Sequence, residues 1–297
     1  MTLLNTCRAY PNPIEAEQVA GVYSSHIPGP YVEKNSLKKK ATKGKEAFFR
    51  FYRELYGERW EALAEALKRE PSPVSFSEGL SKSYYLDQAS IDTAKALGAL
   101  PEEEVLDMCA APGGKSLVIA AAMRGKGVLV ANDRSASRRG RLKRVIAEHL
   151  ISDYAAIVEI TSHDASKWGL YEQNRYDRIL LDAPCSSERH VLSDPIHLER
   201  WSPSRTKRLA VQAFAMAAAA ADALRPGGVL LYSTCTISPF ENDGVIEKLL
   251  KRRGDFMEKA ELSLPYGETT RFGMIVLPDR EEGKGPMYAA LLQKRMT

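Results

Sequence analysis

The sequence predicts an α/β fold, in which a mostly parallel sheet carries helices on both faces and a small helical region precedes it. From about residue 87 onwards, short β-rich runs alternate with helical stretches, which is typical of a parallel sheet. The 297 residues suffice for one large domain with an appendage, and 44% hydrophobic with 27% charged residues is the composition of a folded chain. The longest apolar stretches, such as residues 214–221, are too short for a membrane span, so we expect no membrane association.

The elements can be placed in order along the chain. Apolar residues recur at helical spacing between Lys45 and Arg69, and Pro71 and Pro73 then break the pattern. We therefore expect a basic and aromatic helical region over residues 1–79 and the main domain over residues 80–297. A helix at about 87–98 comes next. The predicted strands are 104–108, 127–131, 156–160, 178–181 and 228–232, with a terminal strand pair at 256–262 and 287–294 separated by a loop.

Two basic clusters are candidate contacts for a polyanion. Residues 34–53 carry eight Lys or Arg against the single acid Glu46, and six aromatic residues lie between Phe48 and Trp60. Basic residues mixed with aromatics suit nucleic-acid binding, whereas the alternative is an amphipathic helix whose aromatics pack inward. The second cluster consists of Arg134, Arg138, Arg139, Arg141, Lys143 and Arg144. Two clusters on one chain favour RNA or DNA as a partner.

The N-terminal segment and the cysteines suggest a compartment. Residues 1–33 show neither a secretory signal nor an Arg-rich transit peptide, so a cytoplasmic location is expected. The four cysteines are Cys7, Cys109, Cys185 and Cys235, and they form no C-x-x-C pair. A zinc site or a disulfide framework is therefore not expected, and any functional thiol should act in its reduced form.

The segment 106–116 reads as a strand, a glycine-containing turn and the start of a helix, which lets the backbone approach a ligand closely. It lacks G-x-G-x-x-G, and a P-loop would need glycine where Cys109 stands. Asp133 ends the second strand, about where an acid binds ribose hydroxyls in nucleotide-binding folds, and Asp164 could accept from an adenine amino group. A nucleoside without a polyphosphate describes S-adenosylmethionine.

Two further cysteines follow apolar strands. Asp182-Ala-Pro-Cys185 follows one strand and Ser233-Thr-Cys235 follows another. If these strands are neighbours in the sheet, both thiols open into one pocket. A buried structural cysteine is the common alternative for either thiol taken alone.

At this point the sequence resembles the NOL/NOP/Sun family of S-adenosylmethionine-dependent RNA cytosine-5 methyltransferases. The matching motifs are D-M-C-A-A-P-G-G-K-S, N-D-R-S-A-S-R, D-A-P-C-S and P-G-G-V-L-L-Y-S-T-C-T-I-S-P-F-E-N. The resemblance implies a class I methyltransferase (Rossmann-like) fold with a seven-stranded sheet. Where many members read C-S-G-x-G, this chain has Cys-Ser-Ser-Glu-Arg-His190, which is similar to the subgroup of the mitochondrial small-subunit rRNA enzyme. The resemblance implies these cofactor-binding residues: Cys109, Ala110, Ala111, Pro112, Gly113, Gly114, Lys115, Asp133, Arg138, Asp164 and Asp182.

The resemblance also implies the chemistry. Cys235 would be the nucleophile that adds to C6 of cytosine, so that C5 can take a methyl group from S-adenosylmethionine. The chemistry itself calls for charge stabilisation at N3 during this addition, which a protonated or proton-sharing carboxyl at Asp182 could supply. By resemblance, Cys185 would assist product release. The base that removes the C5 proton is not identified. The implied partner is RNA, with ribosomal RNA favoured over transfer RNA, and a monomer without a metal ion is expected.

Two other functions fit parts of the sequence. Gly114-Lys115-Ser116 and the apolar run ending at Asp182 imitate a P-loop NTPase, but the leading glycine is missing. A catalytically inactive RNA-binding or ribosome-assembly factor would share the fold, since fold alone does not establish activity. Both thiols together with Asp182 argue against that factor.

Overall fold

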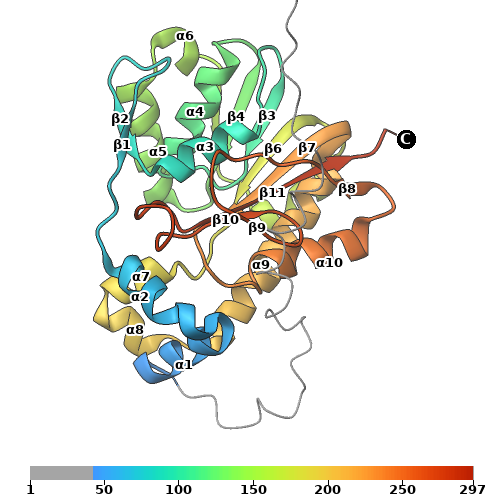
Figure 1. The fold of residues 1–297 in the computed structure, drawn as a ribbon. Coiled ribbons are helices and arrows are strands. Elements are labelled where there is room, and N and C mark those ends of the chain that lie inside the picture. Colours follow the sequence, from blue (N-terminus) through green and yellow to red (C-terminus); the bar gives the residue numbers. More distant parts are fainter. Residues whose placement is uncertain (1–42, 297) are drawn as a thin grey trace, which may run out of the picture.

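A computed structural model describes residues 43–296, and it confirms the predicted α/β class (Figure 1). One large sheet carries helices on both faces, and a group of short helices adjoins one end of it. The basic residues Lys34, Lys38, Lys39 and Lys40, and also Cys7, lie outside the described residues.

The parallel part of the sheet starts at its centre. From β3 (Glu104–Asp107) the chain moves outward through β4 (Val128–Asn132) to β5 (Val158–Thr161), and it returns on the other side of β3 with β6 (Tyr176–Asp182) and β7 (Leu224–Thr234). These five strands are parallel and correspond to the five predicted ones. Because the strand order reverses beside β3, the loops after β3 and β6 open a crevice at their carboxyl ends.

The C-terminal strands add an antiparallel edge. β11 (Met287–Lys294) pairs with β7 and also with β8 (Met257–Lys259), which confirms the predicted terminal pair. The loop between them contains β9 (Glu268–Thr269) and β10 (Met274–Val276), so the described sheet has nine strands rather than seven. Gly273 permits this addition, because a Cβ there would lie 2.1 Å from the carbonyl oxygen of Ala289.

Successive side chains of the central strands face different helix layers, as the two-residue period of a strand requires. Val105 and Leu180 belong to the core beneath α3, α4 and α5, whereas Leu106 and Leu181 belong to the core beneath α9 and α10. The first layer consists of α3 (Gln88–Ala96), α4 (Gly114–Met123), α5 (Ala136–His149) and α6 (Ser152–Ala155), and the second of η3 (Ala165–Leu170), α9 (Pro203–Ala223) and α10 (Asp243–Arg253).

The alanine-rich part of α9 packs as closely as its sequence predicts. Ala217, Ala220 and Ala221 are fully buried, and a Cβ on Gly169 of η3 would lie 3.0 Å from the carbonyl oxygen of Ala219. Small residues on both elements therefore allow their backbones to approach. No described helix combines the length and the apolar composition needed to cross a bilayer.

The helical region before the sheet shares its core with the main domain. Phe48, Tyr52 and Trp60 are 0% exposed; Phe48 and Tyr52 contact Trp201, and Trp60 contacts Phe48 and Tyr52. Their rings therefore pack inward rather than stack on bases. The elements of this region are α1 (Lys45–Tyr56), η2 (Gly57–Arg59), α2 (Trp60–Lys68), α7 (Glu188–Ser193) and α8 (Pro195–Arg200), and the two-stranded sheet of β1 (Val74–Phe76) and β2 (Tyr84–Leu86) leads from α2 to α3. A domain boundary near residue 80 stays a prediction.

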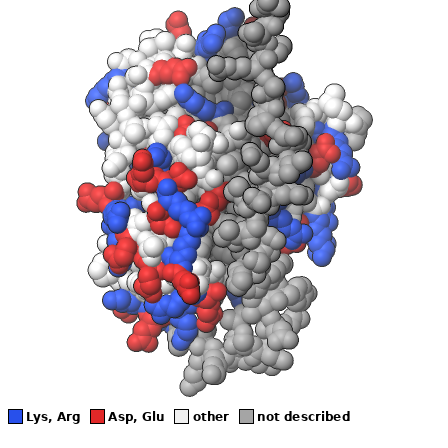
Figure 2. Space-filling view, in the orientation of Figure 1, with Lys and Arg blue, Asp and Glu red and all other residues white. Residues whose placement is uncertain are grey.

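The surface of this helical region does not present a single charge sign. Where α1, α2, α7 and α8 lie in Figure 1, Figure 2 shows Lys and Arg interleaved with Asp and Glu. Arg53 pairs with Glu61, and Lys68 pairs with Glu65. The described part of the predicted basic stretch is therefore largely charge-balanced on this face.

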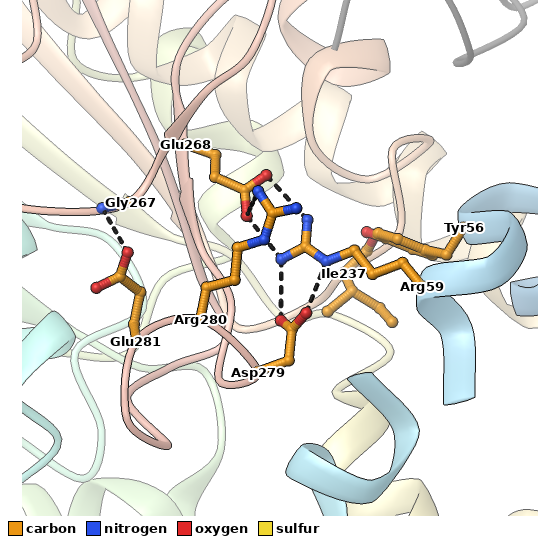
Figure 3. Close-up of polar contacts among 8 residues, drawn as sticks. All are labelled: Tyr56, Arg59, Ile237, Gly267, Glu268, Asp279, Arg280 and Glu281. Atoms are coloured by element: carbon orange, nitrogen blue, oxygen red, sulfur yellow. Dashed lines mark hydrogen bonds and ion pairs between the residues drawn. The ribbon is translucent and has the colours of Figure 1, made fainter. Parts of the chain in front are cut away.

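A partly buried ion cluster attaches η2 to the C-terminal strands (Figure 3). Arg59 donates to Asp279 from Nε at 2.7 Å and from Nη2 at 2.9 Å. It also donates to Glu268 from Nη2 at 2.6 Å and from Nη1 at 2.9 Å. Arg280 approaches Glu268 to 3.6 Å, and the hydroxyl of Tyr56 donates to the carbonyl of Ile237. Two bidentate contacts on one guanidinium fix the orientation of the helical region against β9 and the loop after β10.

We expect Arg59→Ala to lower the free energy of unfolding by about 1–3 kcal/mol, because it leaves Asp279 and Glu268 without their shared cation. The matched control is Arg53→Ala, whose ion pair is more than half exposed and should cost less than about 1 kcal/mol. Urea unfolding followed by circular dichroism measures both. Equal losses for the two variants would contradict the role of the Arg59 cluster.

Candidate active site

A cavity of about 150 Å³ lies at the carboxyl ends of β3 and β6. Most of the predicted cofactor residues line it. Gly113, Asp133, Arg138 and Asp164 do not, and neither do the thiols of Cys185 and Cys235. The lining residues are Tyr84, Tyr85, Leu86, Ser90, Asp107, Cys109, Ala110, Ala111, Pro112, Gly114, Lys115 and Asp182.

The turn before α4 brings its backbone close to neighbouring side chains. Gly113 has φ +122°, a conformation that favours glycine, and a Cβ there would meet Val145 at 3.0 Å. A Cβ on Gly114 would lie 3.0 Å from the Tyr84 ring. Arg138 of α5 donates to the carbonyl of Ala111 at 2.6 Å and so holds the turn from outside. The N-terminus of α4 thereby borders the cavity.

Asp107, the last residue of β3, is a buried carboxyl group on the cavity wall. Its Oδ2 accepts from the Ser116 hydroxyl at 2.6 Å, whereas its Oδ1 has no hydrogen-bond partner. Burial raises its pKa to about 7, and the charge of Asp182 adds to this effect. A buried, unpaired carboxylate oxygen is suited to a cationic ligand.

Lys115 and Asp182 form a partly buried ion pair between α4 and β6. Lys115 Nζ lies 2.7 Å from Asp182 Oδ2, and the Ser233 hydroxyl donates to Oδ1 at 2.9 Å. Burial is the largest single influence and lowers the pKa of Lys115, but the charge and hydrogen bond of Asp182, together with the charges of Cys235 and Asp107, raise it, and the net shift is upward. Lys115 therefore keeps its proton and holds it against Asp182.

The two predicted strand-end thiols meet. β6 pairs with β7 so that Asp182 lies opposite Ser233, and Cys185 Sγ then lies 3.2 Å from Cys235 Sγ. The hydrogen bond from Cys185 lowers the pKa of Cys235, and the same contact, together with burial, raises the pKa of Cys185. Cys109 is a different case, because burial raises its pKa and neither of the other two described thiols contacts it. Of the three described cysteines, Cys235 is the one favoured as a thiolate.

The acids after β4 and β5 lie beside the cavity rather than in its wall. Asp133 accepts from the Ser135 N–H, and its Oδ2 lies 3.3 Å from Arg138 Nε without a hydrogen bond. Asp164 accepts from Ser166, and Arg134 pairs with it at 3.1 Å. Hydrogen bonds from Ser166 are the main cause that lowers the pKa of Asp164.

Some residues of the site were not predictable from the sequence. Tyr84 and Ser90 line the cavity from β2 and α3, and only the glycine at position 114, which admits the Tyr84 ring, hints at that contact. Asn132 joins the ends of β3 and β5 through the carbonyls of Met108 and His163. In the described residues, no group of three or more His, Cys, Asp or Glu is arranged to hold a metal ion.

The family model described as 16S rRNA methyltransferase RsmB/F matches residues 94–293, a range that contains the cavity motif and both thiols. The chain belongs to this family. The resemblance inferred from the motifs is thereby confirmed, and so is the class I methyltransferase fold.

The RsmB/F family match is accompanied by similar individual proteins. The 5-cytosine rRNA methyltransferase NSUN4 of Bos taurus is 34% identical over 71% of this chain and 59% of its own length. The solved structure of NSun6 from Pyrococcus horikoshii with SFG has a TM-score of 0.61 at 28% identity and covers 74% of this chain and 54% of that one. The chain thus spans about three fifths of the NSUN4 relatives it matches.

The expected cytoplasmic location is wrong by these comparisons. A tRNA (cytosine(34)-C(5))-methyltransferase of Danio rerio, 34% identical over 75% of this chain and 65% of its own length, is designated mitochondrial. The location was inferred from the charge of residues 1–33 alone. Import into an organelle depends on recognition of the segment by a receptor, and the composition of residues 1–33 does not determine that recognition.

The asymmetry of the thiol pair can be measured by alkylation. Near neutral pH, iodoacetamide should modify Cys235 faster than Cys185 or Cys109, because the thiolate is the reactive form. Cys185→Ala removes the hydrogen bond that lowers the pKa of Cys235, and it should slow modification by about three- to tenfold.

The matched control is Cys185→Ser, whose hydroxyl can still donate and should preserve most of the rate. Peptide mass spectrometry assigns the modified thiol. Preferential labelling of Cys185 or Cys109 in the unmodified protein would contradict the order of pKa values.

Proposed function

We propose that this chain transfers a methyl group from S-adenosylmethionine to C5 of a cytosine in RNA, through a covalent adduct on Cys235. The observation that carries the proposal is the thiol pair at the ends of β6 and β7, 3.2 Å apart, beside Asp182 and the cavity of the 106–116 motif. Membership of the RsmB/F family and the similarity to rRNA and tRNA cytosine-5 methyltransferases support it.

The residues present fit S-adenosylmethionine. Its ammonium and sulfonium groups are cationic, and the buried carboxyl group of Asp107, which lines the cavity, offers them an anionic partner. The carboxyl group of Asp133, whose Oδ2 accepts no hydrogen bond although Arg138 Nε lies 3.3 Å away, suits a ribose hydroxyl, and Asp164 is the acceptor we assign to the adenine amino group. The residues from Cys109 to Lys115, together with Arg138 and Asp182, would border the ligand. The NSun6 relative, whose structure was solved with SFG, is consistent with such a ligand.

The chain's own residues would then divide the chemistry. The Cys235 thiolate forms a bond to C6 of cytosine, which makes C5 nucleophilic. When bound, S-adenosylmethionine supplies the methyl group that C5 takes up, leaving S-adenosylhomocysteine. The C5 proton then departs to a base, and the bond between Sγ and C6 breaks to restore Cys235. Cys185, which keeps its proton, is placed to assist that release.

The pair of Asp182 and Lys115 would serve the pyrimidine ring. Addition of a thiolate to C6 builds negative charge at N3, which needs a proton or a hydrogen-bond donor. Lys115 holds a proton 2.7 Å from Asp182, so the two residues together supply the proton-sharing carboxyl expected from the sequence. This arrangement also disfavours the P-loop alternative, because Lys115, which would contact a phosphate in a P-loop, is already paired with Asp182.

Ribosomal RNA is the substrate class we favour, since the family model and NSUN4 are both described as rRNA methyltransferases. Transfer RNA is the alternative, because a relative of equal identity is a tRNA methyltransferase. Arg141, Lys143 and Arg144 on the exposed side of α5 are suited to phosphate contacts. A structured target base would have to leave its stack to reach the thiols.

Cofactor affinity should depend on pH through Asp107. Its pKa of about 7 means that Asp107 loses its charge as the pH falls, so S-adenosylmethionine should bind about five- to tenfold more weakly near pH 6 than near pH 7.5. Asp107→Asn should bind weakly at both pH values. Calorimetric titration measures these affinities, with Glu159→Gln on the exposed side of β5 as the control. An unchanged pH dependence in Asp107→Asn would refute the assignment.

The two thiols should give opposite products with RNA. Cys235→Ala removes the attacking group, so neither methylated RNA nor a protein–RNA adduct should form. Cys185→Ala leaves attack and methyl transfer possible but slows release, so RNA should accumulate covalently on the protein. Denaturing gels of each variant with substrate RNA and cofactor measure the adduct, after the unmodified protein has been shown to methylate the same RNA.

Cys7→Ala, which removes a cysteine outside the described residues, controls for general loss of a thiol. An adduct from Cys235→Ala and none from Cys185→Ala would reverse the assigned roles. If Cys235→Ala still methylates C5 of cytosine in RNA, the covalent mechanism through Cys235 is excluded. A folded, cofactor-binding protein that methylates no RNA would favour the inactive binding factor.

A further inference from the structure

Two glutamates without a role in the chemistry above lie directly beneath the thiol pair. Glu188 begins α7, and Glu241 precedes α10; their side chains belong to residues that are 0% and 1% exposed. Both contact Ser186, the residue that follows Cys185. Two carboxyl groups buried together need an explanation, because neighbouring carboxylates in a dry environment repel each other.

The two acids hold the residue that follows each thiol. Glu241 accepts from the N–H of Ser186 at 2.8 Å. Glu188 accepts from the hydroxyl of Thr236, the residue after Cys235, at 2.8 Å, and from the N–H of Ile237 at 2.8 Å. Ser186 and Thr236 also contact each other at 2.9 Å. The separation of the thiols therefore depends on this layer of hydroxyls and carboxyls.

A count of hydrogens shows that the layer contains one more proton than its hydroxyls supply. Ser186 Oγ lies 2.5 Å from Glu188 Oε1 and 2.6 Å from Glu241 Oε1, yet a hydroxyl carries a single hydrogen. Tyr52 and Thr236 already donate to Glu188. If Ser186 also donates to Glu188, then Glu241 must be the donor across its short contact to Ser186.

From this geometry we propose that Glu241 is protonated and Glu188 ionised, and that this acid pair acts as a positioning device that holds Cys185 and Cys235 in contact. The proposal rests on the proposed function only in calling the thiol contact catalytic. Neither carboxyl group reaches the surface, so they act through Ser186 and Thr236 rather than on the substrate.

The electrostatics agree with this assignment. Burial, followed by the charge of Glu188, raises the pKa of Glu241 to about 8. The other titratable groups that face the pair are Tyr52 on α1, Tyr232 on β7 and the two thiols. Below about pH 8 Glu241 keeps its proton and the layer is intact. Above that pH both acids are ionised, and their repulsion loosens the ends of β6 and β7.

The test compares Glu241→Gln with Glu241→Ala. The glutamine amide can donate to Ser186 Oγ while its oxygen accepts the Ser186 N–H, so it imitates a protonated glutamate at every pH. Glu188→Gln is the converse variant, because an amide nitrogen would face groups that donate. Glu172→Gln is the matched control, because Glu172 is an ionised, hydrogen-bonded acid outside this layer. Burial acts to raise the pKa of Glu172, but hydrogen bonds from Tyr176 and Trp168 act to lower it, and the net shift is downward.

Two measurements need no RNA. The infrared spectra are recorded in an Asp107→Asn background, because the pKa of Asp107 is about 7 and its own acid band would otherwise overlap. In that background, spectra near neutral pH should show a protonated carboxylic acid band that disappears with Glu241→Gln and persists with Glu172→Gln. The rate of Cys235 alkylation should stay within about twofold of the unmodified protein in Glu241→Gln and fall at least about fivefold in Glu241→Ala and Glu188→Gln. Urea unfolding checks that each variant is folded.

The third measurement is methylation against pH. The unmodified protein should lose activity as the pH rises through about 8, and Glu241→Gln should lack that loss. An acid band that survives Glu241→Gln in the Asp107→Asn background, or a folded Glu241→Gln as impaired as Glu241→Ala, would overturn the proposal. If the infrared and alkylation results hold but the unmodified protein methylates no RNA, the proposed function fails and the acid pair stands.

Discussion

The parallel pairing of β6 with β7 is the constraint on which the site depends. Its register sets Asp182 opposite Ser233, so the chain leaves both strands at the same level, and the two cysteines that follow come within 3.2 Å. A shift of one residue would turn every side chain of one strand to the other face and separate the thiols. The register is held by the buried faces of both strands, where Leu180 and Leu231 share one core and Ile179 and Leu230 the other.

The same sheet makes the environment in which the charged groups act. Asp107, Lys115 and Asp182 come from β3, α4 and β6, and they converge where the strand order reverses and helices exclude water on both sides. Burial raises the pKa of Asp107, and it also strengthens the pairing of Lys115 with Asp182. The same cavity can therefore present the Asp107 carboxylate to a cationic ligand and the proton shared by Lys115 and Asp182 to a pyrimidine.

Sequence reasoning found the strands, the order of the motifs and the convergence of the thiols, because each depends on local periodicity and on the geometry of parallel sheets. It could not choose between two fates for the aromatics at Phe48 and Tyr52, since both are compatible with helical spacing; the burial of their rings against Trp201 depends on a segment far along the chain. Tyr84, the Arg59 cluster and the pair of Glu188 with Glu241 escape for the same reason, because their partners are not neighbours in sequence.

The helical region is therefore more than an appendage to the sheet. Tyr52 of α1 donates to Glu188 at 2.5 Å, so the layer beneath the thiols is completed by the N-terminal helices. Arg59 joins the same helices to β9, and the Tyr56 hydroxyl reaches the carbonyl of Ile237, two residues after Cys235. Any force that moved this region would act on the segments after β6 and β7 through Tyr52 and Tyr56, and on β9 through Arg59. The position of the helices and the distance between the thiols are thus physically coupled.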